Sequence, residues 1–346
     1  MPAQEKIIFP ATRLTRIIKL DLNTLIIESQ DMKLILVIFV ILGSSQILAA
    51  EYAENTVEIR LKQITRSIHY VEGIPGIATD HEGFISNAGV VITGDGVVIF
   101  DALGTPSLAK KLVDLVRSVT DQPITRVIVS HYHADHIYGL QVFKEIGAKI
   151  YASEGSLKYL ESEIALERLK ERRLSLSPWV NEQTRLIAPD EIFETSTTFR
   201  VGTKKFTISN QGKAHSDGDI AMLVEPDLVL FSGDIIFQDR IPFIGNGDTR
   251  HWLEILEKIE STGLRALVPG HGPASFEPSA TISLTREYLA YMRDVMREGV
   301  DELLSFDEVY SNADWSRFEQ LPAFKEGNRI NAYQVFLSLE QDLLEQ

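Results

Sequence analysis

One short segment, VIVSHYHADHIYG at residues 127–139, constrains this chain more than any other part of the sequence. An apolar run of the kind that forms a buried strand ends at His131, and His133, Asp135 and His136 follow within the next five residues. Alternate residues of an extended chain point the same way, so His131 and His133 can reach one ion together. The other two side chains follow where the chain turns, and they can face a second point nearby. Imidazole nitrogen and carboxylate oxygen are the ligands that zinc takes where thiolate is lacking.

The composition narrows the classes of function. The chain has 346 residues and no cysteine, which excludes disulfides, thiolate nucleophiles and sulfur metal ligands together. Its 34 basic and 49 acidic residues give a formal net charge of −15. Because an acidic surface repels a phosphate backbone, we expect no nucleic-acid partner. A small-molecule substrate is the expected partner of a soluble α/β protein of this kind.

The N-terminal region predicts export. A sequence with the layout of a secretory signal peptide begins at Met32, with a lysine, an apolar run over 34–42 and small residues up to Ala50. That run is short for a membrane span, so we expect a periplasmic or secreted mature protein with no stable span. The segment 1–50 is therefore predicted to be an N-terminal extension plus a signal peptide at about 32–50. An uncleaved anchor is the alternative, and whether the chain starts at its first residue or at Met32 stays open.

The remainder alternates short strands with helices, which is typical of the mixed α/β class. A hairpin is predicted at 94–96, helices over 106–119, 154–173 and 249–261, and a series of strands over 193–231. These elements make up a predicted domain over residues 51–277.

The character of the sequence changes after Pro278. Helical patterns cover 282–299 and 328–344, with a looser stretch between them. Since about 70 residues is small for an independent domain, we interpret 278–346 as a C-terminal helical extension that packs on the main domain.

Three more candidate ligands lie at predicted strand ends. His215 is in GKAHSDGD, Asp234 in LFSGD and His271 in VPGHG. Each of them taken alone is as readily an ordinary turn residue. Because loops at strand ends gather at one edge of a sheet, their combination with His131–His136 predicts a shared site.

These motifs, together with Asp101 in VIFDA, resemble the five ordered motifs of the metallo-β-lactamase superfamily. The resemblance implies a four-layer αββα sandwich with a metal site at one edge and two Zn²⁺ ions. It assigns His131, His133 and His215 to the first metal, Asp135, His136 and His271 to the second, and Asp234 to both. The Asp101 position is implied to be structural.

Two features refine the resemblance. The C-terminal segments YLAYMRDVM, DWSRFEQLPAF and NAYQVFLSLE resemble exported zinc metallohydrolases associated with quinoprotein-relay and sulfur-oxidation systems, which implies a quinoprotein-system partner. Members with a cysteine ligand are excluded, because Asp234 occupies that place, as in glyoxalase II-like, lactonase-like and phosphodiesterase-like members. Tyr138 stands where the superfamily commonly has glycine; we expect its ring to fill the core, with pocket lining as the alternative.

The sequence thus predicts a periplasmic dinuclear zinc hydrolase. A hydroxide shared by two metals would attack a carbonyl of a lactone, thioester or β-lactam-like amide, and Asp135 would be the catalytic residue that orients it and takes a proton. One alternative is a mononuclear iron persulfide dioxygenase on the same fold, which leaves His136 and His271 without a metal. Another is a non-enzymatic accessory protein of a quinoprotein system. Three ligands plus a bridge leave room for water, which favours catalysis over a closed structural site. Substrate and oligomeric state stay open.

Overall fold

The computed structural model describes residues 52–260 and 263–345, and residues from Tyr52 onward form one compact unit. The predicted signal peptide and the rest of segment 1–50 lie outside the described residues, so export stays a prediction. Among the helices that the structure describes, none is both long and apolar enough to cross a membrane.

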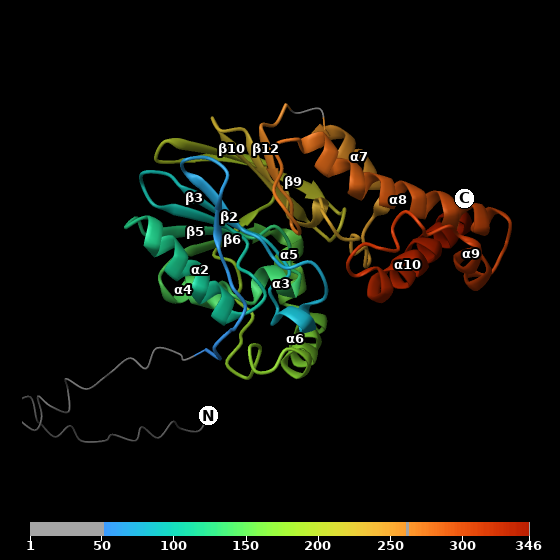
Figure 1. The fold of residues 1–346 in the computed structure, drawn as a ribbon, viewed down its shortest axis with the longest axis horizontal. Helices are drawn as coiled ribbons and strands as arrows, with labels where there is room; N and C mark the ends of the chain where they lie inside the picture. Colours follow the sequence, from blue (N-terminus) through green and yellow to red (C-terminus); the bar gives the residue numbers. More distant parts are fainter. Residues whose placement is uncertain (1–51, 261–262, 346) are drawn as a thin grey trace, which may run out of the picture. The chain divides into compact units, whose positions relative to one another are not determined.

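Two β-sheets pack face to face and carry helices on their outer faces (Figure 1). In the described residues the first sheet has seven strands in sequence order: β1 (Leu61–Gln63), β2 (Ile68–Val71), β3 (Ala88–Ile92), β4 (Val97–Phe100), β5 (Ile124–Ile128), β6 (Lys149–Ser153) and β7 (Glu191–Phe193). Neighbouring strands are antiparallel from β1 to β4 and parallel from β4 to β7.

The second sheet has the order β12-β11-β10-β9-β8. Its strands are β8 (Thr197–Val201), β9 (Lys204–Gly212), β10 (Asp219–Glu225), β11 (Val229–Phe231) and β12 (Ala266–Val268). All neighbours are antiparallel except β11 and β12, which are parallel. Helices α2 (Pro106–Val119) and α4 (Leu140–Glu145) lie on the first sheet, and α7 (Thr249–Glu260) and α8 (Pro278–Asp301) on the second (Figure 1). The predicted αββα sandwich is confirmed.

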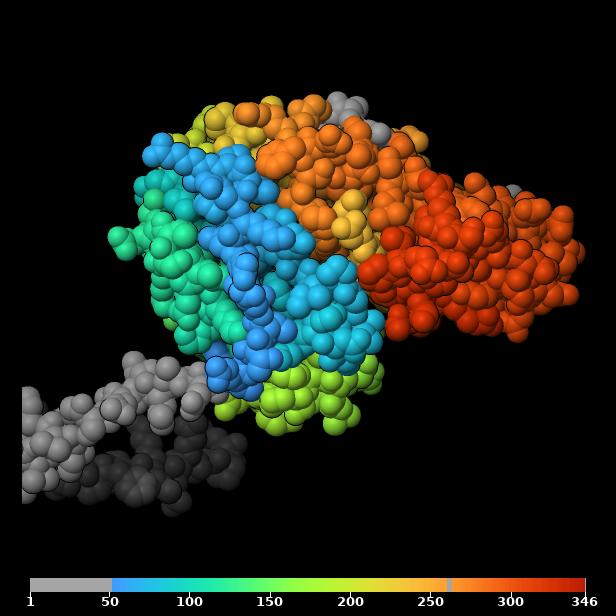
Figure 2. Space-filling view, viewed as in Figure 1, coloured from blue at the N-terminus to red at the C-terminus, as the bar shows by residue number. Residues whose placement is uncertain are grey.

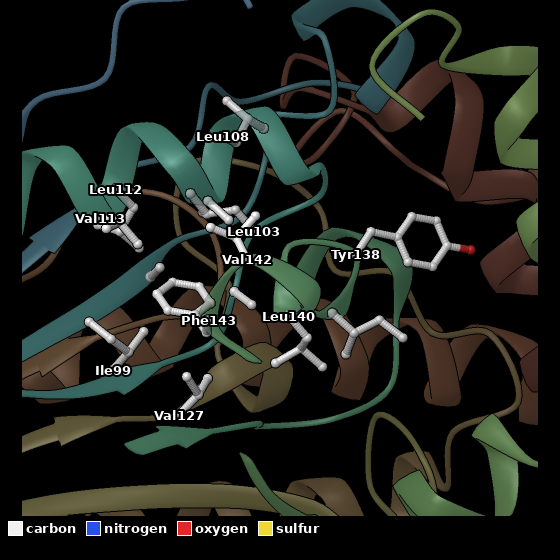
Figure 3. Close-up of a cluster of buried hydrophobic side chains, with 14 of the residues drawn as sticks. Ile99, Leu103, Leu108, Leu112, Val113, Val127, Tyr138, Leu140, Val142 and Phe143 are labelled. Carbon is white, nitrogen blue, oxygen red and sulfur yellow. The ribbon is translucent and has the colours of Figure 1, made fainter. Parts of the chain in front are cut away.

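Strand β4 shows why its sequence is apolar throughout. Val97 and Ile99 pack toward α2 and α4, whereas Val98 and Phe100 point into the layer between the sheets, where the Phe100 ring lies 5.6 Å from that of Phe231. A strand buried on both faces has no polar side to alternate with. Figure 3 shows the helix-side layer of this core. Tyr138 belongs to that layer and is 2% exposed, so the packing role predicted for its ring is confirmed.

Local capping fixes the ends of the helices. Thr105 caps α2 by accepting a hydrogen bond from the Leu108 amide at 3.2 Å, and Pro106 takes the first helical position, where no amide proton is needed. The helix predicted at 106–119 is thereby confirmed. The single helix predicted over 154–173 is wrong. Two helices, α5 (Glu154–Leu160) and α6 (Glu163–Ser175), replace it, because the Ser162 side chain caps a new start at the Ala165 amide.

The C-terminal region consists of α8, α9 (Phe306–Asn312) and α10 (Phe324–Leu344). Figure 2 shows the surface of these helices in orange to red. Their apolar side chains share one buried cluster with α7 and with residues that follow β11, including Phe237 and Ile244. The C-terminal helices are confirmed, while the boundary placed between residues 277 and 278 stays a prediction.

Candidate metal centre

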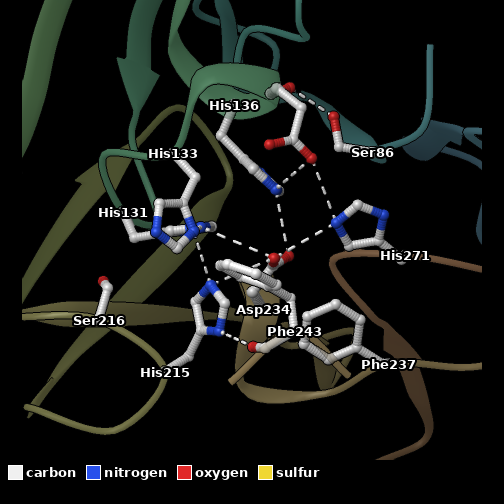
Figure 4. A network of polar contacts seen from close by, with 12 residues as sticks. Ser86, His131, His133, His136, His215, Ser216, Asp234, Phe237, Phe243 and His271 are labelled. Atoms are coloured by element: carbon white, nitrogen blue, oxygen red, sulfur yellow. Dashed lines mark hydrogen bonds and ion pairs between the residues drawn. The ribbon is translucent and has the colours of Figure 1, made fainter. Parts of the chain in front are cut away.

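All the predicted ligands lie at one edge of the sandwich, where the strands of both sheets end (Figure 4). His131 and His133 follow β5, and the short helix α3 (Ala134–Ile137) carries Asp135 and His136. The other three ligands come from the second sheet: His215 lies between β9 and β10, Asp234 on the short helix η2 (Gly233–Ile235) after β11, and His271 after β12. The structure therefore brings together residues that are up to 140 positions apart in the chain, from 131 to 271.

The first donor group contains three histidines and a carboxylate. The Nδ1 of His133 lies 3.0 Å from the Nε2 of His131 and 2.8 Å from the Nε2 of His215. The Oδ2 of Asp234 lies 3.7 Å and 3.4 Å from the same two Nε2 atoms. Four donors at zinc bond lengths of 2.0–2.1 Å in a tetrahedron stand about 3.3 Å apart. The observed spacing brackets that value.

The second donor group shares Asp234 with the first. The Nε2 of His271 lies 3.3 Å from an Oδ2 atom of both Asp135 and Asp234. The Nε2 of His136 lies 3.5 Å from Asp135 and 3.1 Å from Asp234, on the Oδ1 side of the latter. Each oxygen of Asp234 thus faces donors, which is the arrangement expected of a carboxylate between two ions.

The ring nitrogens that point away from the centre are hydrogen-bonded to the protein. The pairs are His131 Nδ1 with Ser130 Oγ at 2.9 Å, His136 Nδ1 with Asp101 Oδ2 at 2.8 Å, His215 Nδ1 with the Phe243 carbonyl at 2.9 Å, and His271 Nδ1 with the Ile85 carbonyl at 2.7 Å. An acceptor at Nδ1 places the proton there and leaves the Nε2 lone pair directed into the centre. In their neutral form, these four rings therefore take the tautomer that binds a metal.

Two buried atoms of the centre lack hydrogen bonds among the described residues: His136 Nε2 and Asp234 Oδ1. They lie 3.1 Å apart but do not form a hydrogen bond with each other. Leaving a buried polar atom unpaired costs about 1–3 kcal/mol, so such atoms require an explanation. A cation held between the donor groups accounts for both, and the residues present fit two zinc ions.

Burial keeps the three histidines of the first group neutral. It lowers the pKa of His133 to about 4 and that of His215 to about 3, and it lowers the pKa of His131 well below its ordinary value. Removing an imidazolium from water is costly, and the nearby histidines add to that cost. The lone pairs of these rings are therefore available near neutral pH without displacing protons.

In the second group, nearby charges outweigh the effect of burial on the pKa values. Burial disfavours the charged forms of His136 and His271, but Asp234 and the other nearby carboxylates outweigh it and raise both pKa values. Burial likewise opposes ionisation of Asp135 and Asp234, yet the adjacent histidines hold the pKa of each carboxyl well below its usual range. Both carboxylates are thus ionised and suited to a cation.

Asp101 holds this edge together without facing the donors. It is 1% exposed and accepts hydrogen bonds from the Ser130 amide at 2.7 Å, the Ser130 hydroxyl at 2.8 Å and His136 Nδ1 at 2.8 Å. Its φ of 65° lies in the left-handed region, which non-glycine residues adopt at a cost. The structural role implied for this position agrees with these contacts.

A cavity of about 320 Å³ opens beside the donors. Its apolar wall includes Ile77, Ile85, Phe237 and Phe243, and its polar wall includes Arg168, Arg172 and Arg240. Among the described residues, Asp135 and Asp234 are the carboxylates that line it. The three arginines belong to no sequence motif that would mark them as site residues.

Arg240 differs from a surface arginine. It is 7% exposed, its Nε donates to the Ile241 carbonyl at 3.3 Å, and its Nη1 lies 3.3 Å from His271 Nδ1. Within residues 52–260 and 263–345 no carboxylate lies within ion-pair distance of it. A guanidinium stays charged even when buried. The cavity therefore contains a buried positive charge that has no directly paired carboxylate, although Asp234 and Asp135 attract it from farther away.

Comparisons with known proteins agree with this geometry. Residues 81–271 match the Metallo-beta-lactamase superfamily. A metallo-β-lactamase type 2 from Bacillus sp. (strain 170) is 26% identical over 196 residues, which cover 55% of this chain and 68% of that protein. A linear primary-alkylsulfatase from Pseudomonas sp. (strain ATCC 19151) is 22% identical over 250 residues, covering 62% of this chain and 47% of that protein. The sec-alkylsulfatase Pisa1 from Pseudomonas sp. superposes with a TM-score of 0.65 at 16% identity, across 81% of this chain and 50% of that one.

The chain belongs to the metallo-β-lactamase superfamily, since the match covers more than half of its length. It is a metal-dependent hydrolase with a histidine and aspartate site of the dinuclear type. The ligand role of each individual residue stays a prediction. So does the quinoprotein association, because the relatives named above are β-lactamases and alkylsulfatases.

Proposed function

We propose that this protein is a periplasmic dinuclear zinc hydrolase of small carbonyl compounds that carry an anionic group. The observation that carries the proposal is a pair of donor groups beside one cavity, with Asp234 of the first group also 3.1 Å from His136 and 3.3 Å from His271 of the second. Zinc at these two positions would supply the Lewis acidity that activates water and polarises a carbonyl. An iron dioxygenase with one metal would leave the second group, His136 and His271, without a partner.

Asp135 is the proposed catalytic residue. Its side chain is 19% exposed and lines the cavity, whereas that of Asp234 is 4% exposed. The Ser86 hydroxyl donates to the Asp135 backbone carbonyl at 2.5 Å and fixes the start of the short helix that carries it (Figure 4). A carboxylate held in this way can orient a water molecule and accept its proton.

The arginines of the cavity favour an anionic substrate. The chain as a whole is acidic, with a net charge of −15, yet Arg240, Arg168 and Arg172 line the cavity beside the donors. Arg168 is paired with Glu171 at 2.8 Å, so Arg240 and Arg172 carry most of this argument. A guanidinium binds carboxylate or sulfate oxygens through charge-assisted hydrogen bonds. A lactone, thioester or β-lactam-like amide with a carboxylate fits this wall. The relative named as an alkylsulfatase adds sulfate esters as a second candidate class.

The first experiment measures hydrolysis of a chromogenic cephalosporin, which carries a carboxylate, by protein loaded with two equivalents of zinc. Asp135→Ala serves as the catalytic variant. Turnover that disappears in the variant would support the proposal for β-lactams. If protein that holds two zinc ions fails on the cephalosporin, on carboxylated lactones and on thioesters alike, carbonyl hydrolysis is wrong and alkyl sulfates become the next substrates to test.

Metal content and location are tested separately. Metal analysis of the purified protein should find two zinc ions per chain; one iron per chain would contradict the proposal in favour of a dioxygenase. We further propose that residues 32–50 act as a signal peptide and that the mature protein is periplasmic. Cell fractionation with N-terminal sequencing should find a chain that begins near Glu51. The proposed quinoprotein-system partner rests on the resemblance of the C-terminal segments, and co-purification with a quinoprotein from the native cell tests it.

A further inference from the structure

We infer that the C-terminal helices hold the metal centre in its binding geometry through two buried side chains, Asn331 of α10 and Thr285 of α8. Both contact the backbone of the segment 237–244, here called the site loop. This segment runs beside the centre outside helices and regular strands. The inference rests on the metal-binding part of the proposed function, and it makes the helices after residue 278 part of the site.

Asn331 forms hydrogen bonds with two backbone groups of the site loop. Its Nδ2 donates to the Pro242 carbonyl at 2.7 Å, and its Oδ1 accepts from the Ile244 amide at 2.9 Å. These two groups flank Phe243 on either side. Asn331 is 0% exposed, and the same Nδ2 also donates to the Tyr288 hydroxyl at 2.9 Å. One side chain of α10 thus fixes the orientation of both peptide units around Phe243.

Phe243 passes this constraint to the first donor group. Its carbonyl accepts the hydrogen bond from His215 Nδ1 at 2.9 Å, which sets the tautomer and the rotation of that ring. Its own ring lies 5.9 Å from the His133 ring and lines the cavity. If the peptide unit after Phe243 rotated, its carbonyl would no longer reach His215. The hydrogen bonds of Asn331 therefore help to hold a proposed metal ligand in place.

Thr285 makes the corresponding contact for the second donor group. Its hydroxyl accepts from the Phe237 amide at 2.9 Å and donates to the Phe237 carbonyl at 3.0 Å, so both backbone groups of one residue are held. The Phe237 ring stacks on the His271 ring, with centroids 5.1 Å apart and planes 5° from parallel (Figure 4). Thr285 is 0% exposed and Phe237 is 1% exposed.

The burial of these polar side chains indicates a specific role. Each lies within an apolar cluster that Leu or Val would fill without the cost of dehydrating an amide or hydroxyl. Their hydrogen bonds are to the backbone of the site loop, so they stabilise one conformation of the loop whatever its side chains are. Two helices that follow the donors in the sequence therefore act as positioning elements, one for each donor group.

Asn331→Leu removes both bonds to the site loop while keeping the approximate size of the side chain. Asn328→Leu is the matched control: Asn328 lies one turn earlier on α10 and is also 0% exposed. Its side chain forms hydrogen bonds with the hydroxyls of Tyr288 and Tyr310 and none with the site loop. Zinc affinity is measured by competition with a chelator, and the ligand geometry by the visible spectrum of the cobalt(II) form. We expect Asn331→Leu to weaken zinc binding at the first donor group about tenfold and to shift the cobalt spectrum.

Thr285→Val is nearly isosteric and tests the second contact without a change in volume. Its control is Thr281→Val, one turn earlier on α8, which is 1% exposed and bonds within its own helix to the Glu277 carbonyl. We expect Thr285→Val to weaken zinc binding at the second donor group about tenfold, and Thr281→Val to leave zinc binding at both groups unchanged. This pair keeps the inference testable if Asn331→Leu does not fold.

The outcomes separate the inference from the proposed function. The inference would be supported if Asn331→Leu and Thr285→Val bind zinc more weakly while their control variants bind it normally. The controls should lose comparable thermal stability in the metal-depleted state. Equal zinc affinity and identical cobalt spectra in each variant and its control would overturn the inference. Wild-type protein that binds no zinc at all would overturn the proposed function and this inference together.

Discussion

The substitution Asp101→Asn tests how far the support behind the donors controls metal binding. The carboxylate accepts three hydrogen bonds, two from Ser130 and one from His136, and is 1% exposed. An asparagine side chain keeps the shape and tolerates the φ of 65°, so the backbone is not perturbed. It has only one accepting oxygen, however, and its amide group must face at least one of the three donors.

The magnitude follows from those contacts. A buried donor left unpaired costs about 1–3 kcal/mol, so we expect the metal-depleted variant to lose stability in that range. Support of this kind behind a metal-binding histidine is worth about 10–100-fold in affinity, which is about 1.4–2.7 kcal/mol. We therefore expect zinc to bind the second donor group, through His136, that much more weakly.

Two assays distinguish these effects. Denaturant unfolding of metal-depleted wild type and Asp101→Asn gives the loss in the free energy of unfolding. Chelator competition gives the affinity of each zinc equivalent. A variant that is destabilised but binds both equivalents with wild-type affinity would refute the argument that the Asp101 contact sets the His136 ring for metal binding.

Three further predictions concern charge, metal and pH. Arg240→Gln should lower kcat/KM about 10–100-fold for a carboxylated substrate, because a charge-assisted hydrogen bond is lost, and should leave an uncharged analogue unaffected; steady-state kinetics on the matched pair checks this. Removal of zinc with a chelator should lower Tm, since metal binds the folded state alone, and equal melting curves would contradict it. Burial raises the pKa values of the Tyr70 and Tyr288 phenols above the ordinary value of about 10. The folded state then holds these protons after the unfolded state has released them, so stability should fall as the pH rises above about 10, with tyrosinate absorbance and circular dichroism changing together.

The features that could be predicted from the sequence are those that neighbouring residues determine. The helix at 106–119 has its own start signal in Thr105 and Pro106, and the structure places its ends at the same residues. The His-x-His-x-Asp-His segment follows a buried strand, and the strand end itself dictates where these side chains lie. The long helix predicted over 154–173 was wrong because the Ser162 side chain caps the start of a second helix. The charged residues on either side of this break both fit a helical pattern, so the pattern does not reveal the break.

Other parts of the site have no local signal. Arg240 looks like any charged loop residue in the sequence, and only the folded chain shows it buried beside His271 without a carboxylate partner. Asn331 and Thr285 lie in helical patterns where a polar residue is usually assigned to the solvent face. Their contacts join positions 87 and 48 residues apart, which no periodicity can relate.

The sequence by itself determined the class of chemistry, because histidines and aspartates at the ends of buried strands can gather in few other ways than around metal ions. It also determined the αββα sandwich through its resemblance to a known superfamily. The tertiary structure alone decided the charge of the cavity and the support of the donors. Those properties depend on which side chains meet after the C-terminal helices dock. Docking is set by apolar packing over the whole interface, to which Phe237 of the site is one of many contributors.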